Sequence, residues 1–198
     1  MTGSSKAVKG EYGAIRQARK KQVLMTVILL SVVLAMFFGG LHYYGSNRNI
    51  FSIMAALCCL PTGWSAVNLI MLLRAGMCSE AAHQQIEKTI DEHLPADQTL
   101  TQAYDLYLTG YSKNFQLSHT AIRGKNIAAL TEDERIDLQA GEEHIRKMIS
   151  GDGFEGYTIK IYTSPEKYIQ RLGSLCELER GNPEREEKLR STLLAISL

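Results

Sequence analysis

Two long uncharged segments near the N-terminus constrain the fold of this chain more than any other feature. Residues 23–41 and 50–73 contain no Asp, Glu, Lys or Arg, and only eight residues separate them. An α-helix rises about 1.5 Å per residue, so roughly 20 apolar residues cross a hydrocarbon core about 30 Å thick. Each segment is long enough to cross. The sequence therefore predicts a two-helix transmembrane hairpin over residues 23–74.

Two other interpretations of the apolar segments fit less well. A signal peptide needs a small-x-small cleavage site after its apolar region. Here the first segment ends in Gly-Leu-His-Tyr-Tyr and a second apolar segment follows at once. A buried hairpin of a soluble protein would usually show polar faces, which neither segment has.

The distribution of positive charge predicts the orientation of the hairpin. Residues 1–22 form a basic tail with six Lys or Arg and a single acid, Glu11, whereas the loop between the segments carries only Arg48. Basic flanks stay on the cytoplasmic side of a membrane. We therefore expect a multi-pass protein of the cell membrane with both termini in the cytoplasm and the lipid bilayer as its first partner.

Small residues recur at four-residue spacing in both apolar segments. Such stripes allow helix backbones to approach closely in lipid. We expect these residues to pack the hairpin on itself, and they are Ser31, Ala35 and Gly39 in the first segment and Ala55, Cys59 and Gly63 in the second.

Residues 79–198 have the patterns of a cytoplasmic α+β domain. Ser79 is placed to cap a helix over residues 79–94, and Thr131-Glu132-Asp133-Glu134 matches a capping box that would open a helix ending at Ile149. Tyr104, Leu106 and Leu108 alternate with polar residues, as on one face of a strand. The predicted order is α-β-β-β-α-β-α-α, with strands at 100–109, 115–123, 127–130 and 157–162 and later helices at 164–178 and 182–196.

The composition of this domain argues against several kinds of ligand. Residues 75–198 hold 14 Lys or Arg and 20 Asp or Glu, a net charge of −6, which disfavours nucleic acid. The four cysteines show no zinc-binding spacing, so we expect reduced thiols and no cofactor or metal. His83 and Glu87 are expected on a solvated helix face, as are Glu142, Glu143, Glu186 and Glu187, and the GxGxxG sequence at 151–156 is expected to be a turn.

Part of the domain resembles a known nuclease pattern. The predicted order contains that of the restriction-endonuclease-like core, and residues 115–122 followed by 126–130 resemble the nuclease-related domain (NERD). In that family a strand ending in Asp-His precedes a strand ending in Glu-x-Lys, and the acids hold magnesium. His119 keeps the His of this pattern, but the Asp, Glu and Lys positions fall on Ser118, Thr131 and Asp133.

These departures imply a nuclease-like site that has lost its chemistry, because two hydroxyls replace the carboxylates that a divalent ion requires. The whole chain also resembles a family of two-pass bacterial membrane proteins with a small α/β cytoplasmic domain. We expect a membrane-anchored, non-enzymatic pseudoenzyme that binds a protein partner, itself or a ligand, or acts as a scaffold. Two alternatives stay open: a small subunit of a membrane complex, and a membrane-tethered, metal-dependent nuclease or nucleotide-acting enzyme.

Overall fold

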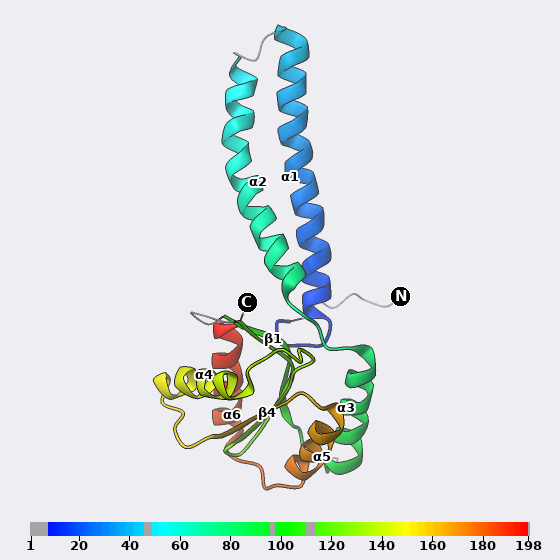
Figure 1. The fold of residues 1–198 in the computed structure, drawn as a ribbon, viewed down its shortest axis with the longest axis vertical. Helices are drawn as coiled ribbons and strands as arrows, with labels where there is room; N and C mark the ends of the chain where they lie inside the picture. Colours follow the sequence, from blue (N-terminus) through cyan, green and yellow to red (C-terminus); the bar gives the residue numbers. More distant parts are fainter. Residues whose placement is uncertain (1–7, 46–48, 96–97, 110–113, 198) are drawn as a thin grey trace. The chain divides into compact units, whose positions relative to one another are not determined.

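The chain divides into two compact units in a computed structural model that describes residues 8–45, 49–95, 98–109 and 114–197. The first unit comprises residues 15–75, and the second comprises residues 76–198 together with the N-terminal residues up to Ala14. Figure 1 shows the paired helices of the first unit and the sheet and helices of the second. Arg48 and most of the turn predicted between the first two strands, residues 110–113, lie outside the described residues.

The first unit is a pair of long helices, α1 (Ala14–Tyr44) and α2 (Ile50–Arg74). Both are long and apolar enough to cross a membrane, and only 11% of the most apolar window of each helix is buried. The two predicted apolar helices are confirmed. However, α1 begins at Ala14, so the second part of the predicted basic tail is helical. Arg and Lys are good helix formers, and the charged segment therefore continues the apolar helix.

Polar side chains join the two helices of the hairpin near one end. Ser65 is fully buried, and its hydroxyl bonds the amide of Gln22 at 3.0 Å and the hydroxyl of Thr26 at 2.9 Å. Arg19 donates to the carbonyl oxygens of Leu72 and Ala75, which satisfies acceptors that the end of α2 leaves free. These bonds fix the pairing of the helices at this end.

The predicted small-residue stripes do not hold the hairpin together. Of the six residues, only Ala55 is buried, and an added Cβ at Gly39 or Gly63 would meet no atom within 4 Å. The close approach is instead at Gly40, where a Cβ would lie 2.7 Å from the Cβ of Phe51. The prediction failed because several registers of small residues run along each helix and spacing alone does not choose among them. The five stripe residues with exposed side chains are Ser31, Ala35, Gly39, Cys59 and Gly63.

The second unit has the predicted element order. Ser79 caps α3, and its hydroxyl accepts a hydrogen bond from the amide of Ala82, as expected for an N-cap. The elements are α3 (Glu80–His93), β1 (Thr101–Thr109), β2 (Asn114–Arg123), β3 (Asn126–Leu130), α4 (Leu138–Gly151), β4 (Thr158–Tyr162), α5 (Pro165–Cys176) and α6 (Pro183–Ile196).

The four strands form one mixed sheet in the order β1-β2-β3-β4. β1, β2 and β3 pair antiparallel, and β4 runs parallel to β3. Helices cover both faces of the sheet (Figure 1): α3 and α5 pack on one, and α4 and α6 on the other. Two apolar cores result, centred on Ile86 and Leu172 on the first face and on Ile145 and Leu189 on the second.

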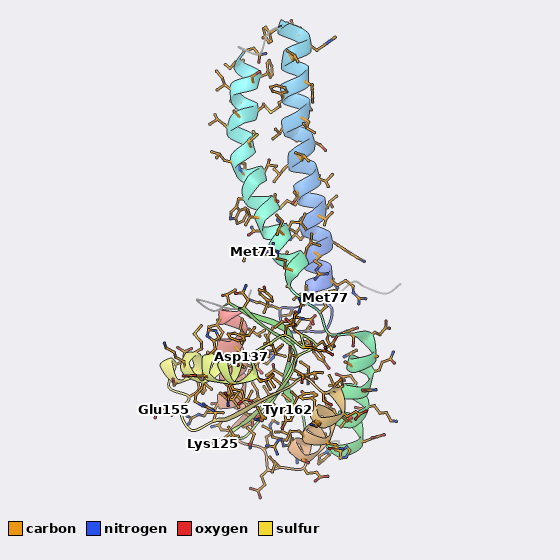
Figure 2. The ribbon with its side chains drawn as sticks, viewed as in Figure 1. Met71, Met77, Lys125, Asp137, Glu155 and Tyr162 are labelled. Atoms are coloured by element: carbon orange, nitrogen blue, oxygen red, sulfur yellow. The ribbon has the colours of Figure 1, made fainter. Side chains whose placement is uncertain are left out.

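The helix predicted to open at the capping box begins later. Asp137, labelled in Figure 2, is the N-cap of α4. Its carboxylate accepts from the amide of Ala140. Thr131 still belongs to the sheet, because its amide donates to the carbonyl oxygen of Tyr162 at 2.9 Å. Its hydroxyl accepts from the amide of Asp133 and so stabilises a local turn instead of a helix. The predicted turn at 151–156 is confirmed, since it joins the end of α4 to β4.

Tyr104, Leu106 and Leu108 do not share one face of the sheet, contrary to the predicted alternation. Tyr104 packs in the core beside α3 and α5, whereas Leu106 and Leu108 pack beside α4 and α6. The cause is Asp105, whose φ of +56° lies in the left-handed region and reverses the phase of the strand.

Two acids that were expected on solvated helix faces are held inside the unit. Glu186 is 2% exposed and accepts from the amides of Gly124 and Gly181 at 2.6 and 3.2 Å and from the hydroxyl of Thr101. Glu142 accepts from the amide of Ile161. Their carboxylate oxygens accept hydrogen bonds from backbone amides that have no partner within a strand or helix.

Candidate functional site

The positions of the predicted degenerate nuclease site lie together, but they are buried. His119 pairs with Leu130 at the end of the β2–β3 ladder, so Ser118 and Thr131 occupy the next opposing positions. Both side chains are fully buried. Asp133 is different, because its carboxylate lies at the surface beside Arg135. The two positions therefore lie opposite each other in the sheet, and both hydroxyls are away from solvent.

Two acids on the neighbouring strand positions hold the segment that leaves the hairpin. Asp105 accepts from the amide of Cys78 at 2.6 Å, and Glu132 accepts from the amide of Ser79 at 3.0 Å. The side-chain oxygen of Gln116 accepts from the amide of Gly76 at 3.0 Å. Three strands or strand ends thus bind three amides of residues 76–79, which we call the connector. Among the described residues, no group of three or more His, Cys, Asp or Glu side chains is placed to hold a metal ion.

The connector also fixes the chemical state of its cysteine. Burial, together with the nearby carboxylates of Glu132 and Asp105, raises the pKa of the Cys78 thiol to about 12. Cys78 and Cys176 are both free and buried. A thiol of this kind stays protonated and behaves as a small apolar group.

His119 lies at the centre of a second polar group, where its ring contacts the ring of Tyr104. The ring is fully buried, and it bonds the hydroxyl of Tyr168 through Nδ1 at 2.5 Å and Oε1 of Gln102 through Nε2 at 3.0 Å. Burial, together with nearby His83, lowers the pKa of His119 to about 3. The ring is therefore neutral. Because Oε1 of Gln102 can only accept, Nε2 carries the proton and Nδ1 accepts from Tyr168.

A partly exposed layer continues this group toward solvent. The hydroxyl of Tyr104 donates to Glu87 at 2.6 Å, and Nδ1 of His83 lies 4.0 Å from the same carboxylate oxygen. The ring of Tyr12 stacks on His83, with 3.7 Å between ring centroids and 8° between planes. Burial and the bond to Glu87 raise the pKa of Tyr104. Tyr104 therefore stays a hydrogen-bond donor. The histidine cluster comprises Tyr12, His83, Glu87, Gln102, Tyr104, His119 and Tyr168.

Tyr12 reaches this cluster through two successive turns just before α1. The amide of Glu11 donates to Val8 and that of Ala14 donates to Glu11, and Gly10 and Gly13 have φ values of +90° and +79°. A glycine with positive φ in the third position is the signature of a type II turn. We call residues 8–13 the N-terminal turn. Its Gly10 carbonyl accepts from the amide of Tyr104, on the open edge of β1.

A cavity of about 370 Å³ opens beside the stacked rings. Arg190 lies on its α6 side, where Nε donates to the carbonyl oxygen of Gln102 and Nη1 pairs with Glu187 at 2.7 Å. The cavity therefore combines aromatic rings with charges of both signs. Its lining residues are Gly10, Glu11, Tyr12, His83, Glu87, Gln102, Tyr104 and Arg190.

Sequence reasoning found His83, Glu87 and His119 but not what they do together. His83 and Glu87 do lie on a partly exposed helix face, as expected, but Tyr12 stacks on the first and Tyr104 bonds the second. Tyr12, Gln102 and Tyr168 carried no local pattern that marked them.

Comparison of the chain with protein-family models, with curated proteins and with solved structures finds no match.

Proposed function

We propose that this chain is a membrane-anchored, non-enzymatic module whose second unit is a degenerate restriction-endonuclease-like domain that binds a partner or ligand. One observation carries this proposal. Asp105 lies opposite Ser118 between the paired residues of β1 and β2, and Glu132 follows Thr131 in the chain; one carboxylate oxygen of each accepts from a backbone amide of the connector. Oxygens committed to amides hold the chain in place, whereas a magnesium site needs carboxylates that face the substrate.

The topology of the sheet supports the endonuclease-like part of the proposal. An antiparallel β1-β2-β3 meander, a crossing helix α4 and a β4 parallel to β3 follow the order expected for that core. Ser118 and Thr131 then occupy the two positions where the family carries its acids. Their hydroxyls are neutral and weaker ligands than the carboxylates they would replace.

Metal binding tests the proposal without knowledge of a substrate. A ligand that binds only the folded state raises its stability by mass action. We expect neither magnesium nor manganese at millimolar concentration to raise the melting temperature of the full chain, and no cleavage of DNA or RNA. A metal-dependent rise that Glu132→Gln abolishes, with Glu134→Gln as the matched control, would instead support the tethered nuclease.

The membrane part of the proposal places both termini in the cytoplasm, because six Lys or Arg precede the first apolar segment. In intact cells, a thiol reagent that cannot cross membranes should label a cysteine placed at Ser46. The same reagent should not reach a cysteine placed at Ser174. Labelling at Ser174 would reverse the orientation.

One observation favours the second candidate, a small subunit of a membrane complex. The stripe of Ser31, Ala35 and Gly39 is exposed on α1 and is not used by the hairpin itself. In a membrane such a surface lets another helix approach closely. If Gly39→Leu releases a co-purifying membrane protein while Gly63→Leu does not, the subunit hypothesis would take precedence over the independent module.

A further inference from the structure

The cavity beside the histidine cluster has the size and the mixed chemistry of a small-ligand site. Its volume of about 370 Å³ lies within the range of about 300–1,000 Å³ that ligand pockets occupy. Two parts of the second unit contribute residues to the cavity. Helices α3 and α6 and strand β1 contribute some of them, and the N-terminal turn contributes Gly10, Glu11 and Tyr12. A molecule bound here would touch both.

The charged groups of the cavity specify what such a molecule must carry. Glu87 uses Oε1 to accept from Tyr104, which leaves Oε2 as an acceptor, and Glu11 adds a second carboxylate. On the α6 side, Arg190 uses Nε and Nη1 in its described bonds, which leaves Nη2 as a donor. Gln102 uses its side-chain oxygen on His119, so its amide nitrogen is also a donor. The cavity thus offers acceptors from α3 and the N-terminal turn and donors from β1 and α6.

Other ligand classes match this arrangement less well. A phosphate would meet two carboxylates and one guanidinium, so the balance of charge opposes it. A nucleobase needs a slot between flat groups, but Tyr12 and His83 already stack on each other at 3.7 Å. A metal ion is disfavoured because the described His, Cys, Asp and Glu side chains form no group of three that could ligate it.

We propose that this cavity binds a small zwitterion, a free amino acid or dipeptide, with its ammonium group on Glu87 and its carboxylate on Arg190 and Gln102. Charge-assisted bonds of both signs would fix the orientation of the ligand. Its side chain would lie against the ring of Tyr12. Because Tyr12 belongs to the N-terminal turn, the bound ligand would also tie this turn to the sheet. The inference rests on the proposed binding function and names its ligand class.

Thermal melting of the full chain in lipid nanodiscs tests the proposal, with the twenty standard amino acids and glycyl dipeptides as probes at about 10 mM. We expect at least one probe to raise the melting temperature, while its N-acetyl and carboxamide derivatives do not. Loss of a charged hydrogen bond costs about tenfold or more in affinity. Glu87→Gln and Arg190→Gln should each show this loss. Glu87→Gln keeps an acceptor for Tyr104, so its fold should survive.

Glu92→Gln is the matched control, because Glu92 lies on the same helix, pairs with Lys88 and does not line the cavity. Its affinity should equal that of the wild type. If no probe stabilises the chain, or if stabilisation survives both cavity variants, the proposal is overturned. Such a result leaves the non-enzymatic module standing, whereas stabilisation by magnesium would contradict that function and not the zwitterion site.

Discussion

The buried carboxylate of Glu186 allows the stability of the second unit to be tested from its contacts. Oε1 accepts from the amides of Gly124 and Gly181, and Oε2 accepts from Thr101 and lies 3.9 Å from Arg180. These partners come from the β2–β3 turn, the loop before α6 and β1. One buried carboxylate therefore accepts hydrogen bonds from two backbone amides and one hydroxyl.

Glu186→Ala would leave those donors without an acceptor. An unsatisfied buried donor costs about 1–3 kcal/mol, and removing one member of a buried charged network costs about 3–5 kcal/mol. We expect a loss of about 3–5 kcal/mol. Glu186→Gln keeps an oxygen for the two amides, and the hydroxyl of Thr101 can rotate to accept from the new amide nitrogen. Its cost should be about 1–2 kcal/mol, roughly one hydrogen bond.

Urea unfolding followed by hydrogen exchange of the backbone amides of β1 to β4 would measure both values, because these amides report the sheet and not the hairpin. Glu187→Ala is the control, since Glu187 is the next residue, is exposed and loses only its pair with Arg190. That change should cost less than about 1 kcal/mol. Equal losses for Glu186→Ala and Glu187→Ala would show that water replaces the carboxylate freely, and the argument would fail.

Three further predictions concern other parts of the chain. Burial lowers the pKa of His119 from 6.5 to about 3, so the unfolded state binds more protons than the folded state between these pH values. The free energy of unfolding should therefore fall as the pH drops below about 6.5, by roughly 2–3 kcal/mol at pH 4.5. Urea titrations of His119→Asn should lack this pH-dependent loss. Gly76→Ala should displace the end of the Gln116 side chain, break its hydrogen bond with the amide of residue 76 and lower the free energy of unfolding by about 1 kcal/mol. The double variant Gly76→Ala, Gln116→Ala should be no less stable than Gln116→Ala alone. Gly40→Leu should weaken inter-helix cross-linking of the hairpin because it meets Phe51, whereas Gly39→Leu should not; equal effects would contradict the assigned helix face.

What could be predicted from sequence was local. Ser79 and Asn182 mark helix starts through bonds to residues two or three positions away, and each does so here. The apolar spacing of α3 likewise needs only one turn of helix to be recognised. His119 depends instead on Gln102 and Tyr168, which are 17 and 49 residues distant along the chain. No local pattern encodes such a contact, so the cluster appeared only in three dimensions.

The phase reversal at Asp105 shows why the simplest strand pattern was wrong. Without it, Tyr104, Leu106 and Leu108 would share one face, and either Tyr104 would leave the histidine cluster or both leucines would leave the core beneath α4 and α6. A left-handed residue costs about 1–2 kcal/mol. Burying one leucine contributes about 1.5–3 kcal/mol, so keeping two leucines in the core outweighs the strain.

Aspartate suits this position better than glycine would. Both residues tolerate a positive φ, but only aspartate offers a carboxylate to the amide of Cys78. Its neighbour Tyr104 donates its own amide to Gly10 of the N-terminal turn. Two adjacent residues of β1 therefore bind the segment that precedes the hairpin and the connector that follows it. Because Tyr104 also contacts His119 and Glu87, the residue that holds the N-terminal turn is itself a member of the histidine cluster.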